Sequence, residues 1–415
     1  MGCFFFTVPI YGLLSSIGLF QTYWRKHQLQ DFSESQVSWI ISMFGFMDCL
    51  FGSPAGILFD KYGVRWLLPL ASTLYLSCFV GLAFSSNYGG FMGCLAMAGI
   101  CAAVPTTLAF AIVSQWFKAH EGLAVGCVTM GAAVGGIFFS LILQVLFERF
   151  EWKAAVLILT GVQAGFFLFG NLLVETNLSR CPPLRGDDGW DLVEVRRMSR
   201  SPRFWLVSYL VFGESSAGGR SHVGGARRLT CHTACELVLF VLWGSLPTYA
   251  VSVGMGKEQF HLMVAYNVGA VIGRSLPLWL SDRKFGPLNT MILMMAATLL
   301  VVLAIWLPFG TSSVTALFAV VVLLGIGTGS SVPLGVACVS ALCEPESTGT
   351  WVGSVYSVAS IATLIGNPST GAILERFQGQ GLVVFLAVVL STGLASMTAL
   401  RWLCHGRRWT LAGKI

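Results

Sequence analysis

Charge is scarce in this sequence of 415 residues. Asp, Glu, Lys and Arg make up 11% of it, whereas hydrophobic residues make up 55%. A soluble domain usually carries about 25% charged residues, because they keep its surface hydrated. The composition therefore excludes an ordinary soluble enzyme and predicts a protein that crosses a membrane several times.

Several signals of other protein classes are also missing. No basic run is interleaved with aromatic residues, so the formal charge of +6 does not indicate nucleic-acid binding. The 12 cysteines are scattered through apolar stretches, which fits small core residues better than a disulfide framework. The one metal-like motif, "CHTAC", has no second Cys/His pair. We expect no metal, no cofactor and no catalytic activity.

Long apolar runs, in contrast, are abundant. A membrane-spanning helix needs roughly 20 mostly apolar residues, and eleven such runs occur. They lie near residues 3–22, 37–58, 66–85, 91–114, 123–147, 154–175, 262–281, 288–309, 313–338, 351–373 and 382–404. The sequence predicts twelve transmembrane helices in two bundles of six, provided that one more helix lies between 203 and 251.

That remaining stretch is broken by a basic, glycine-rich segment. Residues 214–235 contain three arginines and two histidines, and deleting them restores one span of ordinary length. They could form a loop or re-entrant segment, a regulatory insertion, or the translation of an unspliced intron. We favour the intron, because unpaired backbone and arginines in mid-membrane would lack partners. A mature transcript that retains the bases encoding residues 214–235 would overturn this interpretation.

The predicted domains follow from these runs. Residues 1–175 form the first bundle, 176–202 a cytoplasmic linker, 203–404 the second bundle and 405–415 a cytoplasmic tail. With both termini cytoplasmic, the inner loops carry fifteen Lys and Arg and the outer loops six, as the positive-inside rule requires. The insert holds three more, and only Arg274 lies inside a span.

The loop after the second span carries a specific signature, "GILFDKYGVR". A weaker copy, "SDRKFG", follows the eighth span, about half the chain later once the insert is removed. The gating-loop residues are Gly56, Asp60, Lys61, Gly63 and Arg65 in the first copy, and Asp282 and Arg283 in the second. This signature resembles that of the major facilitator superfamily. The resemblance implies an all-α fold of two six-helix bundles.

Longer stretches are similar to the monocarboxylate transporter family, in particular its fungal branch. They include "QWFKAHEGLAVGCVTMGAAVGG", "NVGAVIGRSLPLWLSDRKFGPLN" and "TGTWVGSVYSVASIATLIGNPSTGAIL". The chain departs from the family's proton-coupling residues: Ser15 replaces a lysine and Ala270 an aspartate, while Arg274 is retained. Gly136 replaces the proline of the antiporter signature, which weakens a drug-efflux interpretation.

Two charged residues at membrane depth are the strongest site candidates. An arginine in lipid is costly unless it is paired or hydrated, so Arg274 is expected to face the cavity and bind a substrate carboxylate through two hydrogen bonds. Its alternative role is a structural ion pair. Asp48 is expected near mid-membrane, where an ionised carboxyl is costly and suits a proton carrier. The alternative is a hydrogen bond between helices.

The other candidates are weaker. Glu236, or Glu214 if the insert is cut differently, is expected to titrate within the cavity-lining seventh helix. Asn267, Tyr249 and Tyr11 are substrate-binding candidates, with Gln163 and Asn367 behind them. Each of these five side chains could instead form a packing hydrogen bond between helices.

These observations predict a secondary transporter, active or facilitative, which moves a small organic solute by alternating access. The resemblance implies a monocarboxylate-like solute, with proton symport. The alternatives are a facilitator or efflux carrier for a neutral or cationic metabolite, and a non-transporting sensor or defective gene product. The expected partners are the solute, a proton and the lipid bilayer. We expect a multi-pass protein of the plasma membrane; the sequence does not indicate its oligomeric state.

Overall fold

The chain is described by a computed structural model over residues 2–62, 64–116, 121–174, 223–310, 313–340 and 348–404. These residues are almost entirely helical, and none of them forms a strand. Nine of the helices are long and apolar enough to cross a membrane. The prediction of an all-α, multispanning protein is confirmed.

The helices of the first half precede residue 175. They are α1 (Gly2–Thr7), η1 (Val8–Gly12), α2 (Gly18–Lys26), α3 (Glu34–Tyr62), α4 (Val64–Phe84), α5 (Tyr88–Trp116), α6 (Glu121–Arg149) and α7 (Trp152–Leu173).

The helices of the second half follow residue 222. They are α10 (Val223–Ser252), η2 (Gly256–Glu258), α11 (Gln259–Gly273), α12 (Leu276–Leu280), η3 (Ser281–Phe285), α13 (Pro287–Val301), η4 (Val302–Trp306), α14 (Leu307–Phe309), α15 (Val314–Gly329), α16 (Ser331–Ser340) and α17 (Thr348–Cys404).

Broken helices explain the difference between nine long helices and twelve predicted spans. The first crossing is divided among α1, η1 and α2, and the eighth among α11, α12 and η3. The long helix α17 is two helices that meet at Gln378, whose φ of 54° and ψ of −158° are not helical. Counting these, the described residues contain the twelve crossings that the sequence predicts.

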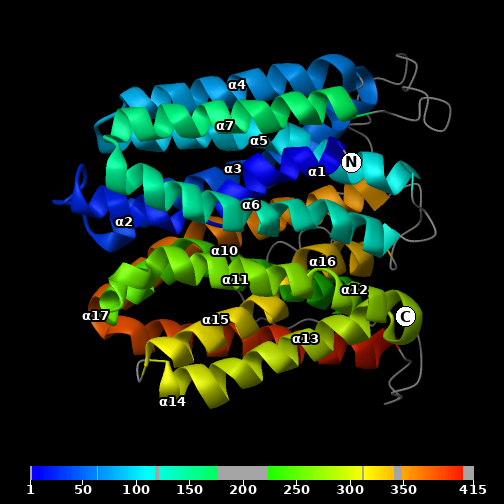
Figure 1. Cartoon of the computed structure of the whole chain (residues 1–415). Helices are drawn as coiled ribbons and strands as arrows, with labels where there is room; N and C mark the ends of the chain where they lie inside the picture. The colour runs from blue at the N-terminus through cyan, green and yellow to red at the C-terminus, as the bar shows by residue number, and fades with distance from the viewer. Residues whose placement is uncertain are drawn as a thin grey trace.

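The two halves of the chain form two groups of helices. Figure 1 shows α1 to α7 together in the upper part of the view and α10 to α17 together in the lower part. The interface between the two groups contains buried aromatic and aliphatic side chains from both, including Leu14, Ile41, Phe240 and Trp243. Side chains at this interface are the natural candidates for a transport site.

Prolines produce the two helix breaks that matter most for the site. Pro277 has no N–H to donate to Gly273 four residues earlier, and the eighth crossing breaks at Arg274 and Ser275. Pro333 likewise leaves the carbonyl of Gly329 without its helical donor, where α15 ends and α16 begins. Both breaks therefore leave a backbone carbonyl without its helical donor in the middle of the bundle.

Glycines on α6 allow close contacts with neighbouring helices. A Cβ atom on Gly135 would lie 2.5 Å from the Val8 carbonyl oxygen, and one on Gly136 would lie 2.3 Å from Ser15 Oγ. The Gly136 position also lies 2.4 Å from the side-chain carbonyl group of Asn267, on α11 in the other half. Gly136 thus lets α6 pack closely against both the first crossing and α11, and a larger side chain at this position would prevent these contacts.

The expected break in the seventh crossing needs a correction. Residues 223–235, the second part of the predicted insert, are helical and continue directly into the span as α10. The apolar part of α10, Ala234–Ser252, is by itself long enough to cross a membrane, so residues 223–233 extend the helix beyond the span. Residues 214–222, and the flank 203–213 that was expected to join the span, lie outside the described residues.

Candidate functional site

Arg274 is the most deeply buried cation among the described residues, with 2% of its surface exposed. Its Nε donates to the Gly329 carbonyl at 3.3 Å, the carbonyl that Pro333 leaves without a helical donor. Its Nη1 donates to the Thr129 carbonyl of α6 at 2.8 Å. Because α6 belongs to the first half and α11 to the second, the guanidinium group joins the two halves of the protein.

Glu236 is the acidic partner of this arginine in the electrostatics of the site. It lies on α10 with 1% of its surface exposed, and its carboxyl group and the Arg274 guanidinium are close enough to interact. Two buried groups of opposite charge partly offset each other's cost of leaving water. The pair therefore places a titratable carboxyl beside the fixed positive charge.

Asp48 provides a second buried carboxyl group, on α3. It is 2% exposed, and Thr106 of α5 donates a hydrogen bond to its Oδ1 at 3.1 Å. Its Oδ2 has no hydrogen-bond partner among the described residues, although Tyr11 lies beside the carboxyl group. Asp48 is therefore a buried carboxyl group that contacts only hydroxyl groups among the described residues.

These residues form what we call the charged layer: Asp48, Glu236 and Arg274, with the tyrosines 11 and 356 beside them. Tyr11 on η1 interacts electrostatically with Asp48, Glu236 and Tyr356, and Tyr356 interacts with both carboxyl groups. The sequence analysis selected four of these five residues, and Tyr356 was missed. A tyrosine in an apolar helix was a signal, but nothing in the sequence distinguished Tyr356 from other tyrosines.

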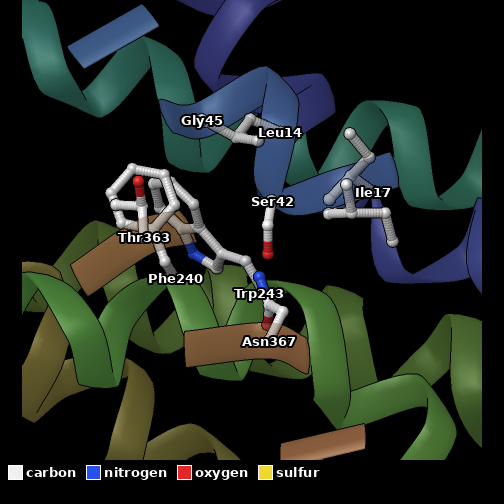
Figure 2. Close-up of a pocket in the computed structure, with 9 residues that line it drawn as sticks. Leu14, Ile17, Ser42, Gly45, Phe240, Trp243, Thr363 and Asn367 are labelled. Atoms are coloured by element: carbon white, nitrogen blue, oxygen red, sulfur yellow. The ribbon is translucent and has the colours of Figure 1, made fainter. Parts of the chain in front are cut away.

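A second group of side chains lines a narrow pocket between the two halves. The pocket, which we call the interbundle pocket, is drawn in Figure 2. Its lining residues are Leu14, Ile17, Ile41, Ser42, Gly45, Phe240, Trp243, Thr363 and Asn367. None of them is charged. Only Asn367 was among the predicted site residues. The sequence analysis selected charged and strongly polar side chains, so it overlooked the apolar and hydroxyl residues of this lining.

A polar seal closes the end of the molecule that carries residues 27–33. Arg25 and Glu34 form a salt bridge of 3.0 Å. The N–H of Glu34 donates to Glu375 Oε1 at 2.5 Å, and Ser35 Oγ donates to the Pro368 carbonyl at 2.9 Å. The last two contacts join α3 to α17 and hold the two halves together at this end, which lies at the left of Figure 1.

The gating-loop residues lie at the opposite end. Asp282 of η3 faces the start of α6, where a Cβ atom on Gly122 would lie 3.0 Å from Asp282 Oδ1. Arg283 lies over the Trp279 ring, 4.8 Å from its centroid, and Arg65 is exposed. Gly56 faces Thr107 of α5. Asp60 and Lys61 belong to the α3 backbone, and their side chains and Gly63 lie outside the described residues.

Two weaker candidates are separated from Arg274, and one lies closer to the interface. Tyr249 accepts a hydrogen bond from Trp306 Nε1 at 3.0 Å, within the second half and near the other end of α10. Gln163 approaches Pro9 and Tyr75 inside the first half. Asn267 is fully buried at the interface, and its Oδ1 has no hydrogen-bond partner in the described part of the chain. Of these three residues, only Asn267 therefore remains a candidate for contact with a solute.

Comparisons with known proteins agree with this architecture. The family profile of the Major Facilitator Superfamily matches residues 1–219 and 229–413, and the gap lies within the predicted insert. The MFS-type transporter hasB of Aspergillus fumigatus is 29% identical over 405 residues, which cover 94% of this chain and 86% of that protein. The aspyridones efflux protein apdF of Emericella nidulans is 27% identical over 393 residues, covering 92% and 73%.

Among solved structures, the human organic anion transporter MFSD10 superposes with a TM-score of 0.69 at 15% identity, covering 95% of this chain and 97% of that chain. At this identity the similarity is one of fold. The family match covers nearly the whole chain, and the alignments cover most of each relative. The chain therefore belongs to the Major Facilitator Superfamily and is a membrane transporter, not an enzyme.

Proposed function

We propose that this chain moves a small organic acid across the membrane by alternating access, in symport with a proton. The observation that carries the proposal is the charged layer: one buried guanidinium and two buried carboxyl groups between the two halves. A buried arginine is a costly feature, and it is suited to recognise a carboxylate through its planar fork of donors. The resemblance of several sequence stretches to the monocarboxylate transporter family supports the same class of solute.

The hydrogen bonds of Arg274 suggest how binding and movement are linked. Its Nη1 bonds a carbonyl of α6, across the interface between the halves. A substrate carboxylate that takes over this donor would remove one contact between the halves. Binding would then favour separation of α6 from α11, so recognition and conformational change would use the same side chain.

Asp48 and Glu236 are the candidates for the coupled proton. Both lie in the charged layer, and Glu236 interacts electrostatically with Arg274. Protonation of Glu236 would leave the arginine's positive charge for the substrate. The expected sequence is therefore proton uptake followed by binding of the acid anion.

Transport assays with the purified full-length chain in proteoliposomes test this proposal. Radiolabelled acids, neutral alcohols and amines are offered at two external pH values. We expect uptake of acids only, faster with an inward proton gradient and lost in Arg274→Ala. Arg149→Ala, the same change at an exposed arginine, is the matched control. Equal uptake of neutral or cationic solutes, or acid uptake that survives Arg274→Ala, would contradict the proposal.

Efflux of a neutral metabolite is the second candidate function. It is supported by the uncharged interbundle pocket and by the relative that is named as an efflux protein. In that case Arg274 would be one member of a structural ion pair and would not contact the solute. The same assay separates the two, because export of a neutral compound should persist in Arg274→Lys.

The orientation and membrane are part of the proposal. The excess of Lys and Arg in the expected inner loops supports cytoplasmic termini, so the polar seal would face outward. A C-terminal tag in intact cells should resist external protease until the plasma membrane is permeabilised. Digestion of the tag in intact cells would mean that the C-terminus faces outward, which contradicts the proposed topology.

A further inference from the structure

The interbundle pocket has the chemistry of a site for an apolar body. Its lining combines three aliphatic side chains with the Phe240 and Trp243 rings, whose centroids lie 5.3 Å apart at an interplanar angle of 68°. Ser42, Thr363 and Asn367 supply the polar side chains of the lining. Aromatic edges and aliphatic walls favour a ring, and the few polar groups can fix its orientation.

The pocket is stacked directly on the charged layer. Each of four crossings carries one residue of the pocket and one of the charged layer, six or seven positions apart. The pairs are Ile17 and Tyr11, Ser42 and Asp48, Trp243 and Glu236, and Thr363 and Tyr356. Six or seven residues advance roughly 10 Å along a helix axis, so the pocket residues lie about that far from the charged layer along each crossing. The seven-residue spacing also places the α10 pair and the α17 pair each on one helix face.

Ser42 is one of the polar side chains that line the pocket. Its side chain is 2% exposed, and its Oγ has no hydrogen-bond partner among the described residues. Figure 2 shows Ser42 and Asn367 pointing toward one another from opposite halves of the protein. A buried hydroxyl group without a partner is costly, and a ligand atom between these two side chains would satisfy it.

We propose that this transporter selects organic acids with an apolar, ring-sized body: the acid group binds Arg274 and the ring occupies the interbundle pocket. The inference rests on the proposed function and narrows its substrate class from short aliphatic acids to arylalkyl carboxylic acids. In the conformation described here the pocket is narrow, because Gly45 faces the Phe240 ring and Gly18 approaches the Gly244 carbonyl. The ring therefore enters when the two halves separate.

Binding of three matched probes to the purified full-length chain tests this selection. The probes are 4-phenylbutyrate, butyrate and 4-phenylbutanol, measured by equilibrium dialysis against excess unlabelled probe. Burial of a phenyl ring should tighten binding of 4-phenylbutyrate over butyrate by about tenfold or more. Binding of 4-phenylbutanol should be weak. Equal affinity for the two acids overturns the inference but leaves the proposed function, whereas Arg274-independent or absent binding of both acids overturns both.

Filling the pocket gives a second test that does not depend on charge. Ser42→Leu places an aliphatic side chain in the pocket and should reduce the ring preference to near unity, with butyrate binding retained. Ser77→Leu is the matched control, because Ser77 is exposed on α4. An unchanged ring preference in Ser42→Leu overturns the assignment.

Enlarging the pocket tests the same site if the filled variant folds poorly. Phe240→Ala should shift preference from 4-phenylbutyrate toward 4-(2-naphthyl)butyrate. A variant that keeps the phenyl preference of the unmodified chain contradicts the inference. Gel filtration of each variant shows whether a loss of binding reflects a loss of folding.

Discussion

The charged layer and the polar seal use the same chemistry at different depths. Both contain an arginine and a glutamate that interact electrostatically. Arg274 and Glu236 are 2% and 1% exposed, whereas the Arg25 and Glu34 side chains are 27% and 23% exposed. An exposed ion pair contributes about 0–1 kcal/mol, while removal of one partner of a buried pair costs roughly 3–5 kcal/mol. Depth therefore predicts that the charged layer determines activity and the seal only adjusts the conformational balance.

The largest effect should follow from Arg274. Arg274→Ala leaves Glu236 buried without its cation and removes the bonds to Thr129 and Gly329. Loss of one partner of a buried charge pair in a binding site costs about 2–5 kcal/mol, which corresponds to roughly 30-fold or more in substrate affinity. Initial uptake rates of a labelled acid measure the loss.

The lysine variant separates charge from geometry at this position. Lysine keeps the positive charge but lacks the planar fork, so Arg274→Lys should recover only part of the activity. Full activity in Arg274→Lys would mean that charge alone is needed. Uptake at the wild-type rate in Arg274→Ala would show that the charged layer, like the seal, does not determine activity.

Depth also explains how much of this site the sequence could predict. Counting residues along the second span predicted that Asp48 lies near mid-membrane, and Glu236 and Arg274 were selected because a charge among apolar residues is conspicuous. The fold followed from eleven apolar runs, one interrupted stretch and the repeated loop signature. The same reasoning selected Tyr249, but that residue lies near the far end of α10 and bonds Trp306 instead.

The interbundle pocket could not be found in this way. Phe240 and Trp243 look like any aromatic residue in a membrane helix, and only packing against the other half distinguishes them. Ser42 did carry a usable signal, because it is a hydroxyl residue six positions before Asp48 on the same helix. The helical course of residues 223–235 was also missed, because glycines and arginines in an apolar chain suggested a break.

A smaller effect is expected from Asp48, because a neutral isostere preserves its contact. An asparagine amide at this position can still accept the hydrogen bond from Thr106, so Asp48→Asn should fold and bind substrate. It should lose accumulation driven by a proton gradient while solute exchange at equal pH continues. Asp31→Asn, the same change in an exposed loop, is the control. Gradient-driven accumulation at the wild-type level in Asp48→Asn would exclude this carboxyl from coupling.

The polar seal should respond more weakly still. Glu375→Gln weakens the contact with the start of α3, and a loss of about 1 kcal/mol changes the ratio of closed to open molecules about fivefold. Labelling of Ser42→Cys by an impermeant maleimide, added at the sealed end, should become faster by that factor. Glu151→Gln, at another exposed glutamate, should leave the labelling rate unchanged. A rate unaffected by Glu375→Gln would show that other contacts keep this end closed.

The smallest effect on transport is expected at the turn inside α17, although it should change stability. Gln378 has a φ of 54° and a ψ of −158°, a backbone conformation that is favourable essentially only for glycine. Gln378→Gly should therefore stabilise the protein by about 1 kcal/mol, which a higher midpoint of thermal unfolding would detect. Because the turn belongs to neither the charged layer nor the pocket, substrate affinity should stay the same. A changed preference between 4-phenylbutyrate and butyrate in this variant would mean that the turn also shapes the binding site. In that case the burial of the charged layer would no longer explain why activity depends on that layer alone.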